Sequence, residues 1–500
     1  MLVVSLLVVV LDNTVLNVAL RVIADPVRGL GASQSELEWA INAYTLTFAG
    51  LLFTWGVLAD RAGRRRILLI GLTLFGLASL ASTWAQTPGH LILARAAMGI
   101  GGAGVLPATL SIISDVFDPS ERARAIGVWA GTVGLATAIG PVVGGWLLEH
   151  FWWGSIFLIN VPIVVVGMVA ILAVVPESRD PRPGRIDIVG VLLSVVGLVS
   201  LVYGIVDGGE HGFLRAQALA PMAAGIAVLA LFIAYERRLT FPALDVRLFA
   251  NSAFSAAVSA LGLAFFAAMG TMFFVSFYLQ TVRGYSPLNA GMMLLPFAGA
   301  QLLFAPRSAA AVRRFGARTV CSTGMALVAT ALIGMAFIDA TTPIWAIGVI
   351  FFVQGAGMAN VMPPATTTAL AALPAEKAGV GSAINNTIRQ VGGALGVAVL
   401  GSLLSSVYRD RLGPEITNLP AAVRTVASES IAGAYGAAER LGPAGDALSG
   451  AADDAFLSAM HLVALAAATV AVIGAVVVGR WLPGRERRSS GPSRTDDPST

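Results

Sequence analysis

Long apolar runs, separated by short breaks that carry charged, Gly or Pro residues, extend along almost the whole chain. A membrane-spanning helix needs about 20 consecutive apolar residues, because the hydrocarbon core of a bilayer is about 30 Å thick. Runs of this length predict fourteen spanning helices, at 1–23, 39–58, 67–85, 91–113, 126–148, 154–175, 187–206, 217–235, 254–280, 288–306, 318–338, 343–371, 380–404 and 456–482. The pattern therefore predicts an all-α polytopic membrane protein.

The first run differs from a cleaved signal peptide. It has no basic leader, and Asp12 and Asn13 interrupt the stretch where a signal peptide would be most hydrophobic. We therefore expect residues 1–23 to remain as a transmembrane helix.

Composition agrees with the membrane class, since 56% of the residues are hydrophobic and only 12% are charged. The single cysteine, Cys321, has no partner for an internal disulfide. His90, His150, His211 and His461 lie far apart, without the spacing of metal ligands. We expect no metal site and no cofactor.

The distribution of basic residues predicts the orientation, because Lys and Arg in short loops resist translocation. If the break after the second run is cytoplasmic, most of the 32 Lys and Arg residues fall in cytoplasmic segments. Both termini are then cytoplasmic, including a polar tail at 483–500. Segment 405–455 is then external, either as a hairpin or as an amphipathic element lying against the membrane.

The two halves of the chain show weak internal similarity. The break GVLADRAGRRR (56–66) resembles AAAVRRFGAR (309–318), so that Gly63 matches Gly316. A parallel repeat of six helices plus six is typical of transporters whose site lies between two bundles.

The seventh and eighth runs have no counterpart in this repeat. We therefore expect a six-helix bundle at 1–175, two inserted helices with their flanking loops at 176–250, and a second six-helix bundle at 251–482.

Six segments occur in a characteristic order on the predicted helices: LDNTVLNVAL (11–20), WAINAY (39–44), GVLADRAGRRR (56–66), RAAMGIGGAG (95–104), GTVGLATAIGPVVGG (131–145) and NNTIRQVGGALG (385–396). With them the chain resembles the major facilitator superfamily, and within it the fourteen-helix drug:proton antiporters of the EmrB/QacA type. The resemblance implies a protein of the bacterial cell membrane, functioning as a monomer, that exports small lipophilic compounds such as drugs or antibiotics in exchange for protons.

Asp12 is the only carboxylate predicted near the middle of the membrane, where a charge is costly unless it is paired, hydrated or protonated. Arg95 lies inside another predicted helix, and the resemblance implies a role near the proton site. If the two side chains meet, Asp12 carries the proton and Arg95 adjusts its affinity. The alternatives are a structural hydrogen bond for Asp12 and a structural contact to backbone carbonyls for Arg95.

The break after the second run carries a cluster of charges at the predicted cytoplasmic mouth. The rule that places basic residues in the cytoplasm does not explain an acidic residue such as Asp60. Asp60 therefore indicates a cluster of ion pairs that stabilises one conformation. The expected members of this switch are Gly56, Asp60, Arg61, Gly63, Arg64, Asp115 and Arg122. The alternative is that the arginines only set the topology.

The fifth predicted helix is rich in small residues, which permit close packing and bending. The members that match the antiporter motif of the family are Gly131, Gly134, Gly140, Pro141, Gly144 and Gly145. The resemblance implies that this motif separates exporters from importers, whereas packing alone is the alternative.

Single polar residues within other helices are candidates for a central substrate cavity: Asn17, Asn42, Gln280, Gln354 and Arg389. Arg389 can equally gate the second bundle or cap helix ends. Since Asp12 is the only deep carboxylate expected, neutral, anionic or monovalent compounds are the expected substrates.

Two other functions compete with export. A proton-coupled importer of small metabolites has the same fold and differs in the direction of transport. A non-transporting receptor or scaffold would tolerate Asp12→Asn. An enzyme is not expected, because the deep positions carry no clustered His, Cys or paired acids.

Overall fold

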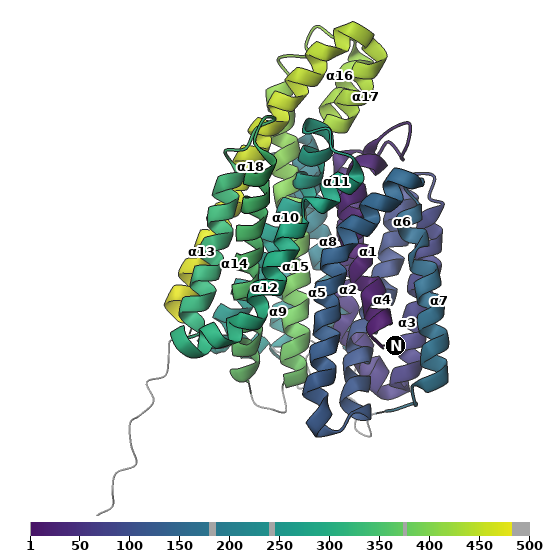
Figure 1. Cartoon of the computed structure of the whole chain (residues 1–500), viewed down its shortest axis with the longest axis vertical. Helices are drawn as coiled ribbons and strands as arrows, with labels where there is room; N and C mark the ends of the chain where they lie inside the picture. Colours follow the sequence, from purple (N-terminus) through teal and green to yellow (C-terminus); the bar gives the residue numbers. More distant parts are fainter. Residues whose placement is uncertain (1, 180–186, 240–245, 374–377, 483–500) are drawn as a thin grey trace, which may run out of the picture.

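The computed structural model of the chain describes residues 2–179, 187–239, 246–373 and 378–482, and every regular element within these ranges is a helix. In chain order the elements are α1 (Leu2–Ala24), α2 (Gln34–Ala62), α3 (Arg64–Thr83), α4 (Pro88–Val116), α5 (Pro119–His150), α6 (Ser155–Leu158), α7 (Asn160–Val174), α8 (Ile188–His211), α9 (Ala216–Glu236), η1 (Val246–Ala250), α10 (Ser252–Phe277), η2 (Tyr278–Val282), α11 (Pro287–Met292), α12 (Leu295–Phe315), α13 (Ala317–Met335), α14 (Ile344–Ala371), α15 (Ala378–Leu412), α16 (Ala421–Glu429), α17 (Ile431–Leu441), η4 (Gly442–Ala444) and α18 (Gly445–Trp481). Figure 1 shows the long helices running side by side along the long axis.

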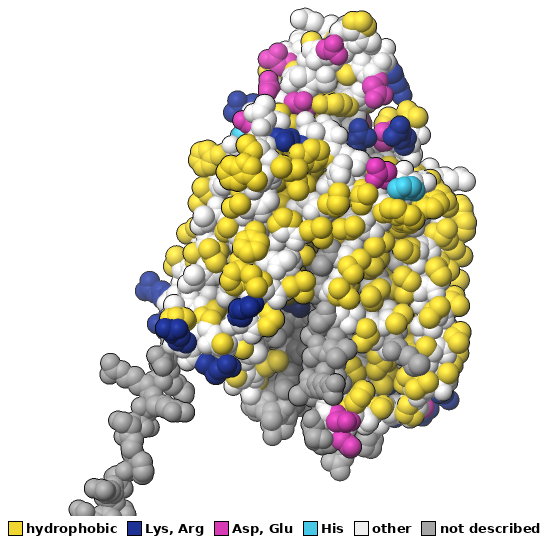
Figure 2. All heavy atoms as spheres, in the orientation of Figure 1, with side chains coloured by type: hydrophobic (Ala, Val, Ile, Leu, Met, Phe, Trp, Pro, Cys, Tyr) yellow, Lys and Arg dark blue, Asp and Glu magenta, His cyan; other side chains and the backbone are white. Residues whose placement is uncertain are grey.

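Thirteen helical segments in the described ranges are long and apolar enough to cross a membrane. Hydrophobic side chains cover the middle of the molecule, whereas most charged side chains lie toward its two ends (Figure 2). The predicted all-α polytopic membrane fold is therefore confirmed. The total of fourteen spans stays a prediction: α5, which is not among the thirteen, packs along α1 in the same bundle.

The helices form two groups. In the first group, α4 packs against α2 and α3, and α1 packs against α5 and α7. In the second group, α14 packs against α12 and α13, and α10 packs against α15 and α18. The same arrangement of neighbours thus occurs twice.

Glycines at matching positions explain why the arrangement repeats. A Cβ at Gly99 of α4 would lie 2.4 Å from the carbonyl oxygen of Tyr44 in α2. In the second group, a Cβ at Gly355 of α14 would lie 2.3 Å from the carbonyl oxygen of Phe297 in α12. Small residues are needed at both positions because the backbones of neighbouring helices touch there.

The break between helices is repeated as well. Gly63 is the one residue between α2 and α3, and Gly316 is the one residue between α12 and α13. Both have positive φ angles, 112° and 85°, in a region that residues with a Cβ rarely adopt. The weak sequence similarity between the two connections therefore corresponds to the same backbone turn in both bundles.

Helices α8 and α9 pack against each other, and α8 contacts both groups. Gly50 of α2 faces Val195 of α8, where a Cβ would lie 2.3 Å from Cγ2 of the valine. Gly209 of α8 faces Ser402 of α15, where an added Cβ would lie 2.3 Å from Cβ of the serine. The pair therefore attaches to the molecule along the boundary between α2 and α15.

Segment 405–455 is helical. Figure 1 shows α16 and α17 beyond the end of the bundle, next to the extended ends of α15 and α18. The Tyr408 hydroxyl donates to the carbonyl oxygen of Ala427 at 3.1 Å, and the Tyr435 hydroxyl donates to the Asp453 carboxylate at 3.0 Å. Of the two expected forms, the structure shows the hairpin.

Candidate functional site

Asp12 and Arg95 meet inside the first group of helices. The Arg95 guanidinium forms an ion pair with the Asp12 carboxylate through Nη1, and its Nε donates to the carbonyl oxygen of Ala40 at 3.1 Å. The exposed fractions of Asp12 and Arg95 are 2% and 0%. The structure therefore brings together the two residues that the sequence predicts as a pair, from α1 and α4.

The other carboxylate oxygen of Asp12 accepts a hydrogen bond from α7. Asn160 Nδ2 donates to Asp12 Oδ1 at 2.9 Å and lies 3.1 Å from the Ser79 hydroxyl oxygen. The Ser79 hydroxyl in turn donates to the carbonyl oxygen of Phe157 at 2.8 Å. Asp12 is thus held by a cation on one side and by an amide on the other.

Tyr44 completes the site. The guanidinium carbon of Arg95 lies 4.3 Å from the centre of the Tyr44 ring, a distance typical of a cation–π contact. Among the described residues, the Tyr44 hydroxyl, Arg95 Nη2 and Asn160 Oδ1 are buried without a hydrogen-bond partner. The site therefore keeps unused polar groups next to its ion pair, and these can bind water or rearranged partners when the helices move.

Sequence reasoning did not single out Asn160, Ser79 or Tyr44. Tyr44 lies in WAINAY and Asn160 in FLINVP (157–162), which resemble the family, but neither segment alone identifies a partner for Asp12. Asn160 begins α7 directly after Ile159, where a predicted single helix is divided into α6 and α7. A buried carboxylate with one cationic and one neutral partner can exist in either protonation state when its access to water changes.

The glycines of α5 pack against the helix that carries Asp12. A Cβ at Gly140 would lie 1.9 Å from the Thr14 hydroxyl oxygen, and one at Gly144 would lie 2.7 Å from Cγ1 of Val15. The backbones of α1 and α5 therefore touch one turn beyond Asp12. The surroundings of Gly131 and Gly134 lie outside what the structure describes.

The adjoining face of α5 contacts the second group. A Cβ at Gly145 would lie 2.5 Å from the carbonyl oxygen of Pro287 in α11. On the α11 side, a Cβ at Gly291 would lie 2.2 Å from the carbonyl oxygen of Pro141. The predicted motif therefore joins the helix of the ion pair to the opposite bundle.

Two further contacts join the bundles at this same end. Gln280 of η2 donates to the carbonyl oxygen of Val18 in α1 at 2.7 Å. Gln34 of α2 donates to the carbonyl oxygen of Gly401 in α15 at 3.1 Å. Among the described residues, the bundles are thus held together at the end that carries segment 405–455.

Gly145→Ala is expected to weaken this contact. The added methyl must displace the backbone of α11, at a cost of about 1–3 kcal/mol typical of overpacking. The variant should fold, with a lower melting temperature and reduced transport. Gly56→Ala is the matched control, since a Cβ there would lie 3.6 Å from Cβ of Pro107, an ordinary contact. Equal melting temperatures for the two variants would contradict the tight α5–α11 contact.

The charged cluster of the second break is centred on Arg64. Its Nε donates to Asp60 Oδ1 at 3.0 Å, and its Nη1 forms an ion pair with Asp115 at the end of α4. The predicted cluster of Asp60, Arg64 and Asp115 therefore exists. Arg61 lies in the last turn of α2 beside Asp60, and the side chain of Arg122 lies outside the described residues.

Glu177 is a member that the sequence did not predict. Its Oε1 accepts from the backbone N–H of Arg65 at 3.0 Å, and its Oε2 lies 3.6 Å from Nε of Arg66. The same carboxylate occupies the space next to Gly63, where a Cβ would lie 2.6 Å from Oε1. A glycine is thus required at position 63, both because of its positive φ angle and because the Glu177 carboxylate fills the space of a Cβ. At Gly56, in contrast, the packing leaves room for a methyl group.

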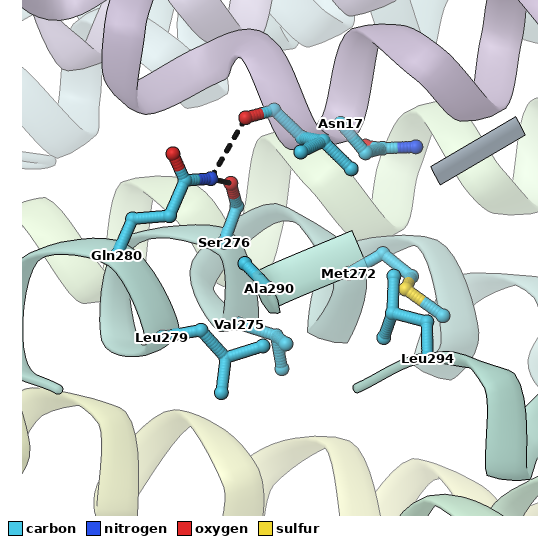
Figure 3. A pocket seen from close by; sticks show the side chains of 9 residues that line it. Asn17, Met272, Val275, Ser276, Leu279, Gln280, Ala290 and Leu294 are labelled. Carbon is cyan, nitrogen blue, oxygen red and sulfur yellow. Dashed lines mark hydrogen bonds between the residues drawn. The ribbon is translucent and has the colours of Figure 1, made fainter. Parts of the chain in front are cut away.

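Two of the predicted cavity residues line one small pocket. Asn17 of α1 and Gln280 of η2 border it together with Met272, Leu279 and Leu294 (Figure 3). The volume of the pocket is about 10 Å³, which is room for roughly one water molecule. At this position the two bundles are in contact, and no drug-sized space separates them.

The other predicted cavity residues lie apart from this pocket. Asn42 and Gln354 are buried, and both amide atoms of each lack a hydrogen-bond partner. Arg389 places its guanidinium carbon 4.5 Å from the centre of the Phe265 ring, and its Nε is buried without a partner. Their expected role in substrate binding stays a prediction.

Glu38 of α2 is a second buried carboxylate. It is 1% exposed and lies near the start of α2, which begins at Gln34 and not at the predicted residue 39. The five additional residues bring Glu38 into the helix and against α15. The expectation that Asp12 is the only carboxylate near the middle of the membrane, and with it the expected preference for neutral, anionic or monovalent substrates, stays a prediction.

A buried ion pair inside one of two repeated bundles of long apolar helices is a feature of a secondary transporter. Residues 2–397 match the family model of the Major Facilitator Superfamily. The chain belongs to this superfamily, which is a family of transporters and not of enzymes. The more specific fourteen-helix assignment stays a prediction.

Characterised relatives cover most of the chain. The multidrug efflux pump LfrA of Mycolicibacterium smegmatis is 37% identical over 95% of this chain and 93% of its own length. The tetracenomycin C resistance and export protein of Streptomyces glaucescens is 34% identical over 95% of this chain and 89% of its own length. The methyl viologen resistance protein SmvA of Salmonella typhimurium is 35% identical over 95% of both chains.

Solved structures share the fold at low sequence identity. A bacterial homologue of the lysosomal transporter Spinster, in an inward-facing and unoccupied conformation, has a TM-score of 0.63 at 17% identity and covers 96% of this chain and 98% of its own. A POT family transporter in complex with 5-aminolevulinic acid has a TM-score of 0.64 at 14% identity and covers 95% of this chain and 94% of its own. These likenesses confirm the architecture of the chain.

Proposed function

We propose that this chain exports small lipophilic compounds, such as drugs or antibiotics, in exchange for protons. The observation that carries the proposal is the buried Asp12, paired with Arg95 and with Asn160 on helices that pack against the glycine face of α5. A carboxylate in this position binds a proton in one conformation and releases it in another, since opening of the site to water changes the cost of its charge. Two relatives are a multidrug efflux pump and a tetracenomycin C resistance and export protein, and they support export as the direction of transport.

The proposed orientation places both termini in the cytoplasm of a bacterial cell and segment 405–455 outside. The bundles at 1–175 and 251–482 would then rock about the central site, with residues 176–250 beside them. In this orientation the contacts of Gly145, Gln280 and Gln34 close the external end. The structure would then correspond to a state whose external side is shut, and the monomer would be sufficient for transport.

The Arg64 cluster lies at the other end of α2, on the proposed cytoplasmic side. It joins α2, α3 and α4 through one guanidinium, so that these helices move together. We propose that Asp60, Arg64 and Asp115 stabilise one conformation of the first bundle and release it during the transport cycle.

Transport by proteoliposomes tests the proposed function. Protein reconstituted with an imposed proton gradient should move dyes and antibiotics against the direction of proton flow, and a panel should include neutral, monovalent and divalent compounds. Movement of substrate and protons in the same direction would favour the importer. If no gradient-dependent movement of any compound occurs, while the reconstituted protein remains folded, the receptor or scaffold interpretation gains support.

A further inference from the structure

A cavity of about 270 Å³ lies at the proposed external end, between α2, α8, α15 and α16. Its charged and titratable lining residues are Glu38, Glu210, His211, Arg409 and Glu429. The remaining lining is mostly Ser, Thr and Gln side chains, so the cavity is polar. Water can therefore enter next to a closure that joins the two bundles.

Glu38 belongs to both the cavity and the closure. Its side chain lies against α15 so closely that a Cβ at Gly401 would lie 2.4 Å from Oε1. The Ser402 hydroxyl lies 3.4 Å from Glu38 Oε2, at the long limit of a hydrogen bond. The carboxyl group of Glu38 therefore lies against the backbone of α15, with the Ser402 hydroxyl and the Gln34 side chain as its polar neighbours.

Charge around this carboxyl group is mainly of the same sign. Within the described part of the chain, no cation lies within ion-pair distance of Glu38, although Arg409 and His211 border the cavity. The carboxylates of Glu210 and Glu429 face the same space, and His211 is engaged by Asp207 at 3.1 Å. Burial, followed by the charges of Glu210 and Glu36, raises the pKa of Glu429. An ionised Glu38 would thus be buried with Arg409 beyond ion-pair distance and with the like charge of Glu210 nearby, which disfavours this packing.

We propose that Glu38 is a second proton-binding residue of the transport cycle, and that the external contact between α2 and α15 closes only when Glu38 carries a proton. The polar cavity supplies the path between this carboxyl group and external water. Opening of the bundles would expose Glu38, where it exchanges its proton, and closure would bury the neutral form. External protons would thereby promote the return of the empty transporter to the state that is shut outside.

This inference rests on the proposed function, because it assigns the cavity to the outside and the closure to the transport cycle. It differs from the role of Asp12, which lies in the interior of the first bundle. Glu38 is a positioning residue that acts on the contact between bundles. Its effect is therefore sought in the pH dependence of that contact and not in transport activity alone.

Ser405 offers a reporter for the contact, because it lines the cavity and is 5% exposed. The buried Cys321 is replaced by Ser, Ser405 is replaced by Cys, and right-side-out vesicles are treated with a membrane-impermeant thiol reagent across external pH values from about 5 to about 8. A second protein carries the cysteine at the exposed position Thr417. The rate at position 405 is divided by the rate at position 417, because the reactivity of both thiols rises with pH and this common effect cancels in the ratio.

We expect the labelling ratio of the native Glu38 protein to fall by roughly tenfold from high to low external pH, as the closed state becomes populated. Glu38→Gln, which resembles the protonated carboxyl group, should give a low ratio at every pH. Glu210→Gln is the matched control, since it removes an acid from the same cavity and leaves the Glu38 carboxyl group on α15 in place, and it should retain the pH dependence.

A Glu38→Gln protein that keeps the native pH dependence would overturn the proposal. Labelling of the cysteine at position 405 only from the cytoplasmic side of the membrane would also overturn it. If Glu38→Gln does not accumulate, Glu38→Asp replaces it: a moved midpoint of the labelling curve supports the proposal, and an unchanged midpoint overturns it. The labelling needs no substrate. Absence of antiport in proteoliposomes would therefore count against the proposed function, whereas antiport combined with pH-independent labelling counts against Glu38 alone.

Discussion

Asp12→Asn is expected to reduce gradient-driven substrate transport to the level of protein-free liposomes. The amide keeps the shape of the side chain and can still accept a hydrogen bond from Asn160, but it cannot bind and release a proton. Substrate binding in detergent should persist, because the first bundle remains packed. The measurement is dye transport driven by an imposed proton gradient, together with the proton flux that accompanies it.

Asp25→Asn is a suitable control for this experiment. Asp25 follows α1, is half-buried and is paired with Arg21 at 3.0 Å, and its Oδ1 accepts from the backbone N–H groups of Val27 and Arg28. Asp25→Asn should leave transport close to that of the native protein, since asparagine keeps an oxygen that accepts these hydrogen bonds. Native-like transport by Asp12→Asn would show that Asp12 is structural and that proton coupling lies at another residue.

Arg95→Ala is expected to destabilise the protein by about 3–5 kcal/mol, the usual cost of removing one partner from a buried ion pair. The substitution leaves Asp12 without its cation, and Tyr44 loses the charge that lies over its ring. Denaturant titration in detergent micelles measures the free energy of unfolding.

A double-mutant cycle separates the ion pair from simple loss of volume. In the Asp12→Asn background, Arg95→Ala should cost less than it does in the native background, because the charge that it would leave unpaired is absent. Equal costs in both backgrounds would show that Arg95 stabilises the bundle through Ala40 and Tyr44 alone.

The sequence predicts most helices well because the bilayer imposes a minimum length of apolar chain. The predicted run 343–371 and α14 differ by one residue at its start. Large differences occur where helices next to segment 405–455 extend beyond the predicted runs: α18 begins at Gly445 instead of 456, and α15 ends at Leu412 instead of 404. Hydropathy cannot detect such extensions, since they are stabilised by helix caps and by contacts with segment 405–455.

The predicted pairing of Asp12 with Arg95 could be made because charges inside apolar runs are rare and need partners. Asn160 could not be identified in the same way, since a neutral amide in an apolar run carries no comparable cost. Glu38 was missed for a different reason. It lies one residue outside the predicted run, and its burial depends on the long-range contact of α2 with Gly401, which the periodicity of a single helix does not reveal.

Helices α8 and α9 have a consequence for the route by which a lipid-dissolved compound enters. The two bundles meet at two seams, one between α2 and α15 and the other between α5 and α12. The first seam is covered by α8, which contacts both of its helices and carries α9 on its outer side. We therefore expect a molecule diffusing within a membrane leaflet to find this side of the protein screened. Lateral entry from the bilayer would then be directed to the contact between α5 and α12, so that α8 and α9 would make the transporter one-sided with respect to the surrounding lipid.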